Sequence, residues 1–407
     1  MDDGVVEPLD RLQRAPAVSG RTLTAYLLLP RPADMVKAFV LPLTFGLGVL
    51  GAGGVDAAQL LRALVVWAAM ELLIYQARYQ WNDVRGFAAD QVHPDAVARG
   101  RLPGPGERGR AHIAASVAVA TCRLLLTAGL ALLFWRDLGH VLVTVTVAVF
   151  GVAAVYEWVR SMCTGRTAQI PPPLHPALVA TWIAVGAGYA VRGVTGLALA
   201  VELDAAPALA AASCLTMWAV GTAFVTCRWS LEAMPFARLS DGQLLWQAQE
   251  GLAREHTLGL VRWLPPRVDR RDVADGGGVG RWRALHGRTP LHAPWNVATV
   301  IAAAGAAATG HLLVDGADGG VTALLAAAGV SSGLVVVLTA RRRALAALAA
   351  ASALALVEGA LGLPQPLVAV LPMLAVLLAH ASFTSQCQAD LGHPLHRLQA
   401  LALRTGR

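Results

Sequence analysis

Charged side chains are scarce in this sequence. Asp, Glu, Lys and Arg make up 14 % of its 407 residues, against about 25 % in an average soluble domain. Hydrophobic residues make up 56 %, and the mean hydropathy is +0.54. So little charge excludes an ordinary soluble domain, because most of the chain would meet water with apolar side chains. We therefore expect most of it to lie in lipid.

Cysteine patterning is also missing. The five cysteines show neither a CxxC pair nor a Cys/His spacing, which argues against a disulfide framework and against a structural zinc site. A cleavable signal peptide is not apparent either, because the first thirty residues are polar and mixed and lack an apolar core. We expect the first apolar run to serve as the insertion signal.

Strand-like alternation is absent, whereas apolar runs long enough to cross a bilayer as helices recur along the chain. Only helices and closed barrels satisfy their backbone in lipid, so the sequence predicts an all-α integral membrane bundle of nine or ten helices. The predicted spans are Met35–Leu50, Ala57–Arg78, Ala111–Phe134, Val141–Arg160, Pro176–Leu199, Ala205–Arg228, Val297–Val314, Val321–Ala340, Leu345–Leu361 and Pro366–Phe383.

The connections between these spans alternate in charge. Those at 83–110, 160–173, 228–295 and 341–343 are rich in arginine, while those near 56, 202–204 and 315–318 hold acidic residues and no arginine. By the positive-inside rule, the arginine-rich connections are cytoplasmic. We expect a cell-membrane protein whose two termini are also cytoplasmic, and this favours an even number of ten spans. The net charge of +7 has the same explanation and does not imply nucleic acid as a partner.

The predicted organisation follows from these loops. We expect a cytoplasmic segment at 1–33, a first membrane part at 34–228 with a polar loop at 81–110, a cytoplasmic loop or cap at 229–295, C-terminal helices at 296–384 and a cytoplasmic tail at 385–407. Apolar residues between Gln243 and Leu264 recur at helical spacing, so this part of the cap is expected to form a surface or lid helix.

Two carboxylates begin the polar loop. If the second span continues as a helix past Trp81, Asp83 and Asp90 lie two turns apart on the same face, next to Asn82. Mg²⁺ takes one or two protein carboxylates and completes its shell with water and phosphate oxygens. The three side chains are therefore candidate Mg²⁺ ligands.

The same loop holds arginines that suit phosphate. Arg85, Arg99 and Arg101 carry forked donors that match phosphate oxygens, and Arg108 follows them. The alternative interpretation is a charged, solvated connection without a ligand. The spacing of the carboxylates and the basic turn after them favour a site for Mg²⁺ and phosphate.

Some ionisable residues fall well inside predicted spans. Glu71, Arg123 and Arg192 are costly in hydrocarbon unless they pair or face a cavity. We expect Glu71 to pair with Arg123 or Arg192, either for structure alone or at a site. The lone histidines, including His311 and His380, are interpreted as packing or interfacial residues.

The polar loop resembles a known motif. Asn82-Asp83-x-x-Gly86-x-x-x-Asp90 is similar to the first aspartate-rich motif of the UbiA superfamily of intramembrane prenyltransferases, and "ARGRLPG" (Ala98–Gly104) is similar to the turn that follows it there. "PRPADMVKAFVLPL" (Pro30–Leu43) is similar to the superfamily's entry segment, and Ala177–Gly196 to its fifth helix. The local pattern is closest to the branch that makes decaprenyl-phosphate phosphoribose.

The chain also departs from the family's pattern. Gly86 stands where the first motif has its middle aspartate, and Arg160 of Tyr156-x-x-x-Arg160 stands where a lysine is usual. The second aspartate-rich motif is not recognisable, and Glu232 and Asp241 are the nearest candidates for a second acidic site. The acidic run Asp269–Asp275 is interpreted as a solvated linker.

The resemblance implies a Mg²⁺-dependent membrane transferase. It would ionise an isoprenoid diphosphate and pass the prenyl group to an aromatic or lipid acceptor, with Asp83, Asp90 and Arg160 as catalytic residues. Lys37 and Arg228 would join the diphosphate site. Three alternatives stay open: a terpene cyclase of this type, a polyprenyl-phosphate phosphoribosyltransferase, and a non-catalytic membrane protein of the same fold.

Overall fold

The structure, a computed structural model, describes residues 21–93, 96–104, 108–163, 165, 169–246, 254–268, 289–315, 319–339 and 342–385. Within these residues ten helical segments are long and apolar enough to cross a membrane. The predicted fold class, an all-α multi-pass membrane protein, is confirmed. The segments are Asp34–Ala52, Ala57–Arg85, Gly109–Leu133, Trp135–Ser161, Pro176–Ala198, Pro207–Phe236, Pro294–Val314, Gly319–Leu338, Arg343–Ala360 and Pro366–Ser385.

The described residues fall into two compact units. The first holds residues up to 38 and residues 64–153, and the second holds residues 39–63 and those from 154 onward. The first unit and the helices that lead into and out of it contain α2 (Leu23–Leu28), η1 (Pro32–Phe39), α4 (Ala57–Ala68), η2 (Ala69–Ile74), α5 (Tyr75–Arg85), α6 (Phe87–Gln91), α7 (Ala96–Arg99), α8 (Gly109–Leu133), η4 (Trp135–Gly139) and α9 (His140–Ser161).

Helix α8 organises the first unit by burying one face. Ser116, Arg123, Thr127 and Ala131 are buried, and their spacing of seven, four and four residues puts them on one side of the helix. This side packs against α2, η2 and α5. Leucines elsewhere on α8 are exposed, as expected of a surface that meets lipid.

The second unit contains the remaining elements. They are α3 (Val40–Ala52), α10 (Pro176–Ala184), α11 (Ala187–Ala198), η5 (Leu203–Ala205), α12 (Pro207–Glu232), η6 (Met234–Phe236), β1 (Ala237–Ser240), β2 (Gln243–Trp246), α13 (Glu255–Leu258), η7 (Gly259–Trp263), α14 (Pro294–Val314), α15 (Gly319–Leu338), α16 (Arg343–Ala360), α17 (Pro366–Ala369) and α18 (Leu371–Ser385).

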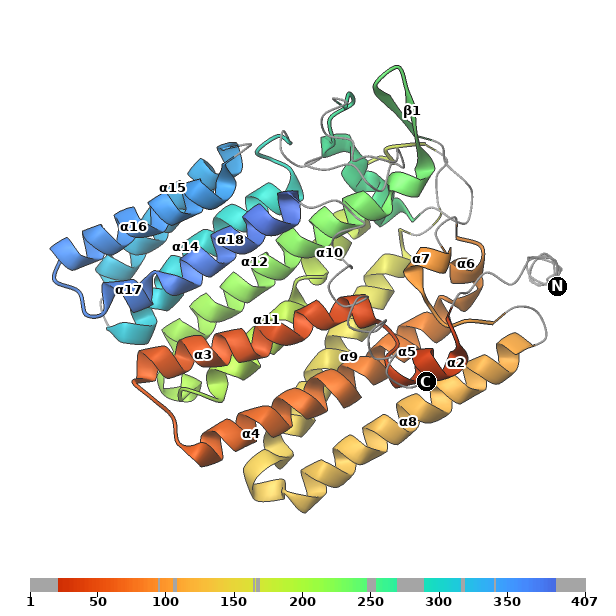
Figure 1. The fold of residues 1–407 in the computed structure, drawn as a ribbon, viewed down its shortest axis with the longest axis horizontal. Coiled ribbons are helices and arrows are strands. Elements are labelled where there is room, and N and C mark those ends of the chain that lie inside the picture. Colours follow the sequence, from red (N-terminus) through yellow and green to blue (C-terminus); the bar gives the residue numbers. More distant parts are fainter. Residues whose placement is uncertain are drawn as a thin grey trace, which may run out of the picture. The chain divides into compact units, whose positions relative to one another are not determined.

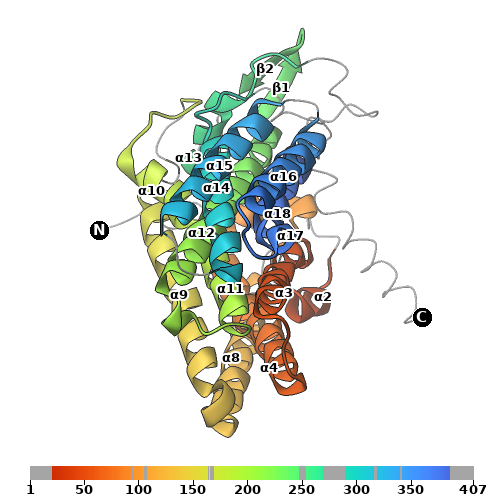
Figure 2. The same cartoon turned by 90° about the vertical axis from the view of Figure 1, so that its left-hand side faces the viewer.

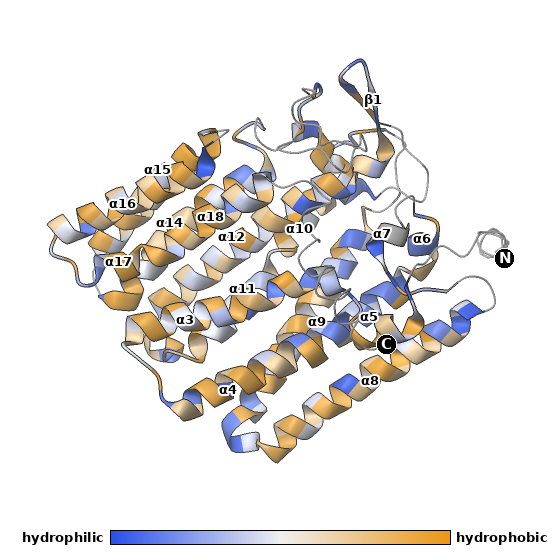
Figure 3. Cartoon of the chain, viewed as in Figure 1, coloured by the Kyte–Doolittle hydropathy of each residue, from blue (hydrophilic) through white to orange (hydrophobic). Residues whose placement is uncertain are grey.

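Helix α14 is the centre of the second unit and packs against α12, α15 and α18 (Figure 1). Small residues allow this close approach, as is usual between membrane helices. A Cβ atom on Gly305 would lie 2.6 Å from Oγ1 of Thr216 on α12, and one on Gly310 would overlap the carbonyl oxygen of Ala369 on α17. Apolar residues cover most of α14 to α18 (Figure 3).

The predicted lid helix from Gln243 to Leu264 is wrong. Strands β1 and β2 instead form an antiparallel hairpin in which Ser240 pairs with Gln243 (Figure 2). Asp241 and Gly242 at its turn have positive φ angles of 50° and 75°, the conformation that Asp-Gly adopts in two-residue hairpins. This local turn preference prevailed over the helical spacing of the leucines, and only α13 and η7 are helical in the described part of that segment.

We expect Gly310→Ala to destabilise the protein by about 2 kcal/mol, because the new methyl group would press α14 away from α17. Gly46→Ala on α3 is the matched control, since a Cβ there meets nothing within 4 Å. The unfolding temperature of the detergent-purified protein should fall for the first variant and not for the second. An equal temperature for both would contradict the close α14–α17 contact.

Candidate functional site

Asp83 at the end of α5 is fully buried and is the centre of a charged cluster in the first unit. Its Oδ1 accepts hydrogen bonds from Nε of Arg31 at 3.2 Å, from Nη2 of the same arginine, and from Nη1 of Arg101 at 3.3 Å. The hydroxyl of Tyr26 donates to Oδ2 at 3.3 Å. Both carboxylate oxygens therefore have donors.

Two segments far apart in the sequence supply these donors: the entry segment and the loop after α7. Tyr26 belongs to α2, Arg31 precedes η1, and Arg101 follows α7. Gly100 has a φ of +52°, a conformation that side chains rarely adopt, and it turns the chain between α7 and Arg101. The buried carboxylate thus joins α5, the entry segment and the loop after α7.

The cluster changes the titration of the side chains around Asp83. Burial alone would lower the pKa of Arg31, but the neighbouring carboxylates of Asp83 and Asp34 raise it well above its usual value. Burial raises the pKa of the Tyr26 hydroxyl, and the negative charge of Asp83 raises it further. The arginine is therefore charged and the tyrosine neutral at physiological pH.

Arg21 holds the same segments together by hydrogen bonds to their backbone carbonyls. Its Nη1 donates to the carbonyls of Pro30 at 2.8 Å and Gly100 at 3.2 Å, and its Nη2 donates to those of Ala25 and Leu29. Burial lowers the pKa of this guanidinium. The carbonyls of Leu29 and Pro30, which directly follow α2, gain a donor in this way.

Arg123 of α8 satisfies two more carbonyls of α2. It donates to Oε1 of Gln80 and to the carbonyls of Leu27 and Leu28 at 2.8 and 2.9 Å. Of the two partners predicted for Glu71, Arg123 is therefore excluded, because main-chain and amide oxygens take its donors. Pairing of Glu71 with Arg192 stays a prediction. Glu71 itself is buried in the π-helical stretch η2.

Asp90 is buried on α6. Its Oδ1 lies 3.0 Å from Nη1 of Arg99, although the N–H is not directed at it, so this oxygen accepts no hydrogen bond from the described residues. The predicted continuous helix from Asp83 to Asp90 is wrong, since α5 ends at Arg85 and α6 begins after Gly86. The glycine that replaces the middle aspartate interrupts the helix there.

Among the described residues in this part of the first unit, positive charge exceeds negative charge. Lys37 pairs with Asp34 at 2.7 Å, and Arg31 lies 3.8 Å from the same carboxylate. Five described cations face three described carboxylates, a formal excess of two positive charges. The cations are Arg21, Arg31, Lys37, Arg99 and Arg101, and the carboxylates are Asp34, Asp83 and Asp90.

The predicted Mg²⁺ ligands fit a metal unequally. Asp83 does not fit, because its oxygens already accept hydrogen bonds from two arginines and a tyrosine. Asp90 fits better, because Oδ1 accepts no hydrogen bond from the described residues, but it lies 3.0 Å from Nη1 of Arg99, so a metal bound there would have to displace this ion pair. Among the described residues no group of three His, Cys, Asp or Glu side chains is arranged to hold a metal ion.

Two other predicted residues lie near Asp83 in the sequence. Asn82 is partly buried on α5, where its carbonyl accepts a hydrogen bond from Gly86. Arg85 is exposed, and its guanidinium lies 5.3 Å from the centre of the Trp81 ring. Neither residue is among the donors to Asp83 or Asp90.

The remaining predicted residues belong to the second unit. Arg160 pairs with Glu157 and lies over the ring of Tyr156, and Arg228 lies 3.6 Å from Glu232. Asp241 occupies the hairpin turn, and Arg192 is buried on α11. The acidic run Asp269–Asp275 lies outside the described residues.

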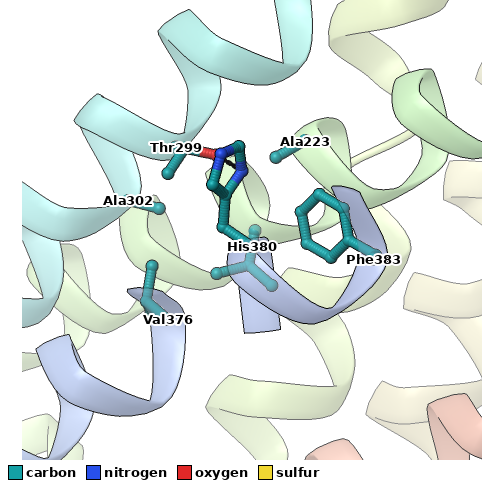
Figure 4. A pocket seen from close by; sticks show the side chains of 7 residues that line it. Ala223, Thr299, Ala302, Val376, His380 and Phe383 are labelled. Carbon is teal, nitrogen blue, oxygen red and sulfur yellow. Dashed lines mark hydrogen bonds between the residues drawn. The ribbon is translucent and has the colours of Figure 1, made fainter. Parts of the chain in front are cut away.

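A small cavity in the second unit lies between α12, α14 and α18 (Figure 4). Its lining is apolar apart from Thr299 and His380, and the threonine hydroxyl lies 2.8 Å from Nδ1 of the histidine. Phe383 stands edge-on to the imidazole ring. The prediction that His380 serves packing agrees with this setting.

Reasoning from the sequence missed three members of the cluster: Tyr26, Arg31 and Arg21. A signal was present, because a buried aspartate needs a cation and Arg31 stands in the polar entry segment just before the first span. The sequence does not show which of several arginines reaches Asp83. That choice depends on how the entry segment folds back over α5.

Comparison of the chain with protein-family models, with curated proteins and with solved structures gives no match.

We expect Arg31→Gln to destabilise the protein by about 3 kcal/mol, because it leaves a buried carboxylate short of its main counter-charge. Lys37→Gln is the control and should cost about 1 kcal/mol or less, since the Lys37–Asp34 pair is partly exposed. Thermal unfolding in detergent measures both. Similar losses for the two variants would contradict the central role given to Asp83.

Proposed function

We propose that the protein is a membrane-embedded transferase that binds an isoprenoid diphosphate at the charged cluster of the first unit. The observation that carries the proposal is the excess of positive charge around Asp83 and Asp90, next to a long apolar span. A diphosphate would supply the negative charge that the cluster lacks. Its isoprenoid tail would lie among apolar helices, where it avoids water.

Arg99 and Arg101 are the proposed diphosphate contacts. Their side chains are about one-fifth exposed, at 23 % and 19 %, whereas that of Arg31 is 11 % exposed. Guanidinium groups make paired hydrogen bonds to phosphate oxygens and hold their charge at any physiological pH. Arg31 and Tyr26 would then keep Asp83 in place and so fix the loop that presents Arg101.

The arginines would favour the chemical step through the charge on the leaving group. Negative charge on the diphosphate grows as its bond to the prenyl carbon breaks. The arginine side chains held by the buried carboxylate would already point at the leaving group before this charge develops. They would therefore stabilise the transition state more than the ground state. The resulting allylic cation would be captured by an aromatic or lipid acceptor.

In the proposed complex, Mg²⁺ binds together with the diphosphate. Asp90 is the predicted ligand whose Oδ1 could still coordinate it, and Asp83 is proposed to position arginines instead. A bound Mg²⁺ would supply further neutralisation of the departing diphosphate. Magnesium ions usually bind through one or two carboxylates together with substrate phosphates, so one ligand is compatible with the ion.

We also propose that the protein lies in the cell membrane with both termini in the cytoplasm. The positive-inside rule supports this orientation, because the loops that hold Arg99, Arg101 and Arg342 are basic. The charged cluster would then face the cytoplasm, where diphosphate substrates are made.

A non-catalytic membrane protein of the same fold is the second candidate. The observation in its favour is that Asp83 has its hydrogen-bonding capacity filled by Arg31, Arg101 and Tyr26. A cluster satisfied within the protein can serve structure alone. Cyclase and phosphoribosyltransferase activities would use the same diphosphate site and are separated from prenyl transfer by the products.

The test is release of inorganic diphosphate by detergent-purified protein with Mg²⁺. Geranyl, farnesyl, geranylgeranyl and phosphoribosyl diphosphates are offered in turn, without and with a lipid or aromatic acceptor. We expect release from one donor, and a loss of at least about tenfold, or 1.4 kcal/mol in the barrier, for Asp90→Asn or after metal removal. Asp204→Asn, an exposed carboxylate on η5, is the control and should keep full activity.

Other outcomes decide between the candidates. Release without an acceptor, with a cyclised hydrocarbon or alcohol as product, would identify a cyclase. Dependence on phosphoribosyl diphosphate and a polyprenyl phosphate would identify a phosphoribosyltransferase. No release from any donor, or equal release by Asp90→Asn and the unmodified protein, would refute the proposed site and favour the non-catalytic candidate.

A further inference from the structure

A buried carboxyl group lies in the second unit, on a span that the proposed transferase does not use. Glu358 stands in the last turn of α16 and is 1 % exposed. Neither of its carboxyl oxygens has a hydrogen-bond partner among the described residues. Since an ionisable side chain inside a membrane span is costly, its retention without a partner indicates a site.

The elements packed against α16 offer Glu358 no counter-charge. These elements are α15, α17 and α18, and their one ionisable side chain is His380, which binds Thr299. Arg343 lies on α16 itself, fifteen residues earlier, which is about 22 Å along a helix. An ion pair therefore does not explain the carboxyl group.

A second ionisable group beside α17 is also buried without a partner. His311 on α14 is 1 % exposed, and neither ring nitrogen has a hydrogen-bond partner in the described part of the chain. Its neighbour Gly310 is pressed against Ala369 of α17. Helix α17 packs against both α14 and α16 (Figure 1). The two side chains thus belong to helices that pack against the same short helix.

We propose that Glu358 is a proton-binding site within the membrane part of the second unit, separate from the diphosphate site. The occupant that fits is a proton, because it needs no cavity and removes the charge that would otherwise stand unpaired against apolar side chains. The neutral acid is compatible with the tight packing of α16 on α17. Release of the proton would leave an uncompensated charge there and loosen this contact.

The test uses dicyclohexylcarbodiimide, an apolar reagent that reacts with protonated carboxyl groups in membranes. The carboxyl oxygen adds to the central carbon of the reagent while its proton moves to a nitrogen. The O-acylisourea then rearranges to a stable N-acylurea, and no further reactant is needed. The whole protein in liposomes is treated at pH 6 and at pH 9, and the labelled peptides are identified by mass spectrometry.

We expect the label on Glu358 at pH 6, less of it at pH 9, and none on Glu358→Gln. Glu157 is the matched internal control, since it is equally buried but paired with Arg160 and should stay unlabelled. Glu202, which is exposed, is the second control and should also stay unlabelled. No label on Glu358 at either pH, or label that is equal at both, would overturn the proposal. Protection of Glu358 by Na⁺ at pH 6 would show a cation site instead and would overturn it too.

A second measurement does not depend on the reagent. Glu358→Gln replaces a neutral acid with a neutral amide of nearly the same shape, so the unfolding temperature should match that of Glu202→Gln. A clear drop for Glu358→Gln alone would show that the native state uses the negative charge, and would contradict proton binding. Diphosphate release is unaffected by this substitution if the two sites are independent, so failure of either proposal leaves the other testable.

Discussion

The buried carboxylate of Asp83 is the group on which the first unit depends. A lone carboxylate at this depth would be very costly, and two arginines and a tyrosine offset the cost by donating to both of its oxygens. These donors come from segments before the first span and after α7. One charge therefore determines where three polar segments lie, and Arg21 and Arg123 secure the same arrangement by donating to backbone carbonyls.

This arrangement gives the two carboxylates different roles. Asp83 holds arginines, whereas Asp90 faces a single arginine and has an oxygen that accepts no hydrogen bond from the described residues. Gly86 stands between them and ends α5, so the two side chains do not lie on one continuous helix. The chemistry proposed for the site follows from this inequality: fixed arginines bind the diphosphate, and one carboxylate is left for its accompanying cation.

The second unit depends on small side chains instead of charge. Glycine and alanine along α14 allow α12, α15 and α18 to approach closely, which is how membrane helices gain contact without a hydrophobic driving force. Such tight packing leaves little room for polar groups. Buried Glu358 and His311 are therefore unusual in this setting, and a bound proton reconciles the carboxyl group with its neighbours.

The sequence by itself determined the class of fold, because the length and spacing of apolar runs depend only on the thickness of a bilayer. All ten spans follow from it. The sequence also singled out Asp83, but as a metal ligand and not as the partner of two arginines and a tyrosine. Asp241-Gly242 is a local hairpin signal that the sequence itself holds, and it outweighs the helical spacing of the leucines after it. Tertiary structure alone decided which arginines reach Asp83 and that Arg123 binds main-chain carbonyls rather than Glu71. These two outcomes depend on contacts between segments distant in the sequence, and composition and spacing do not contain that information.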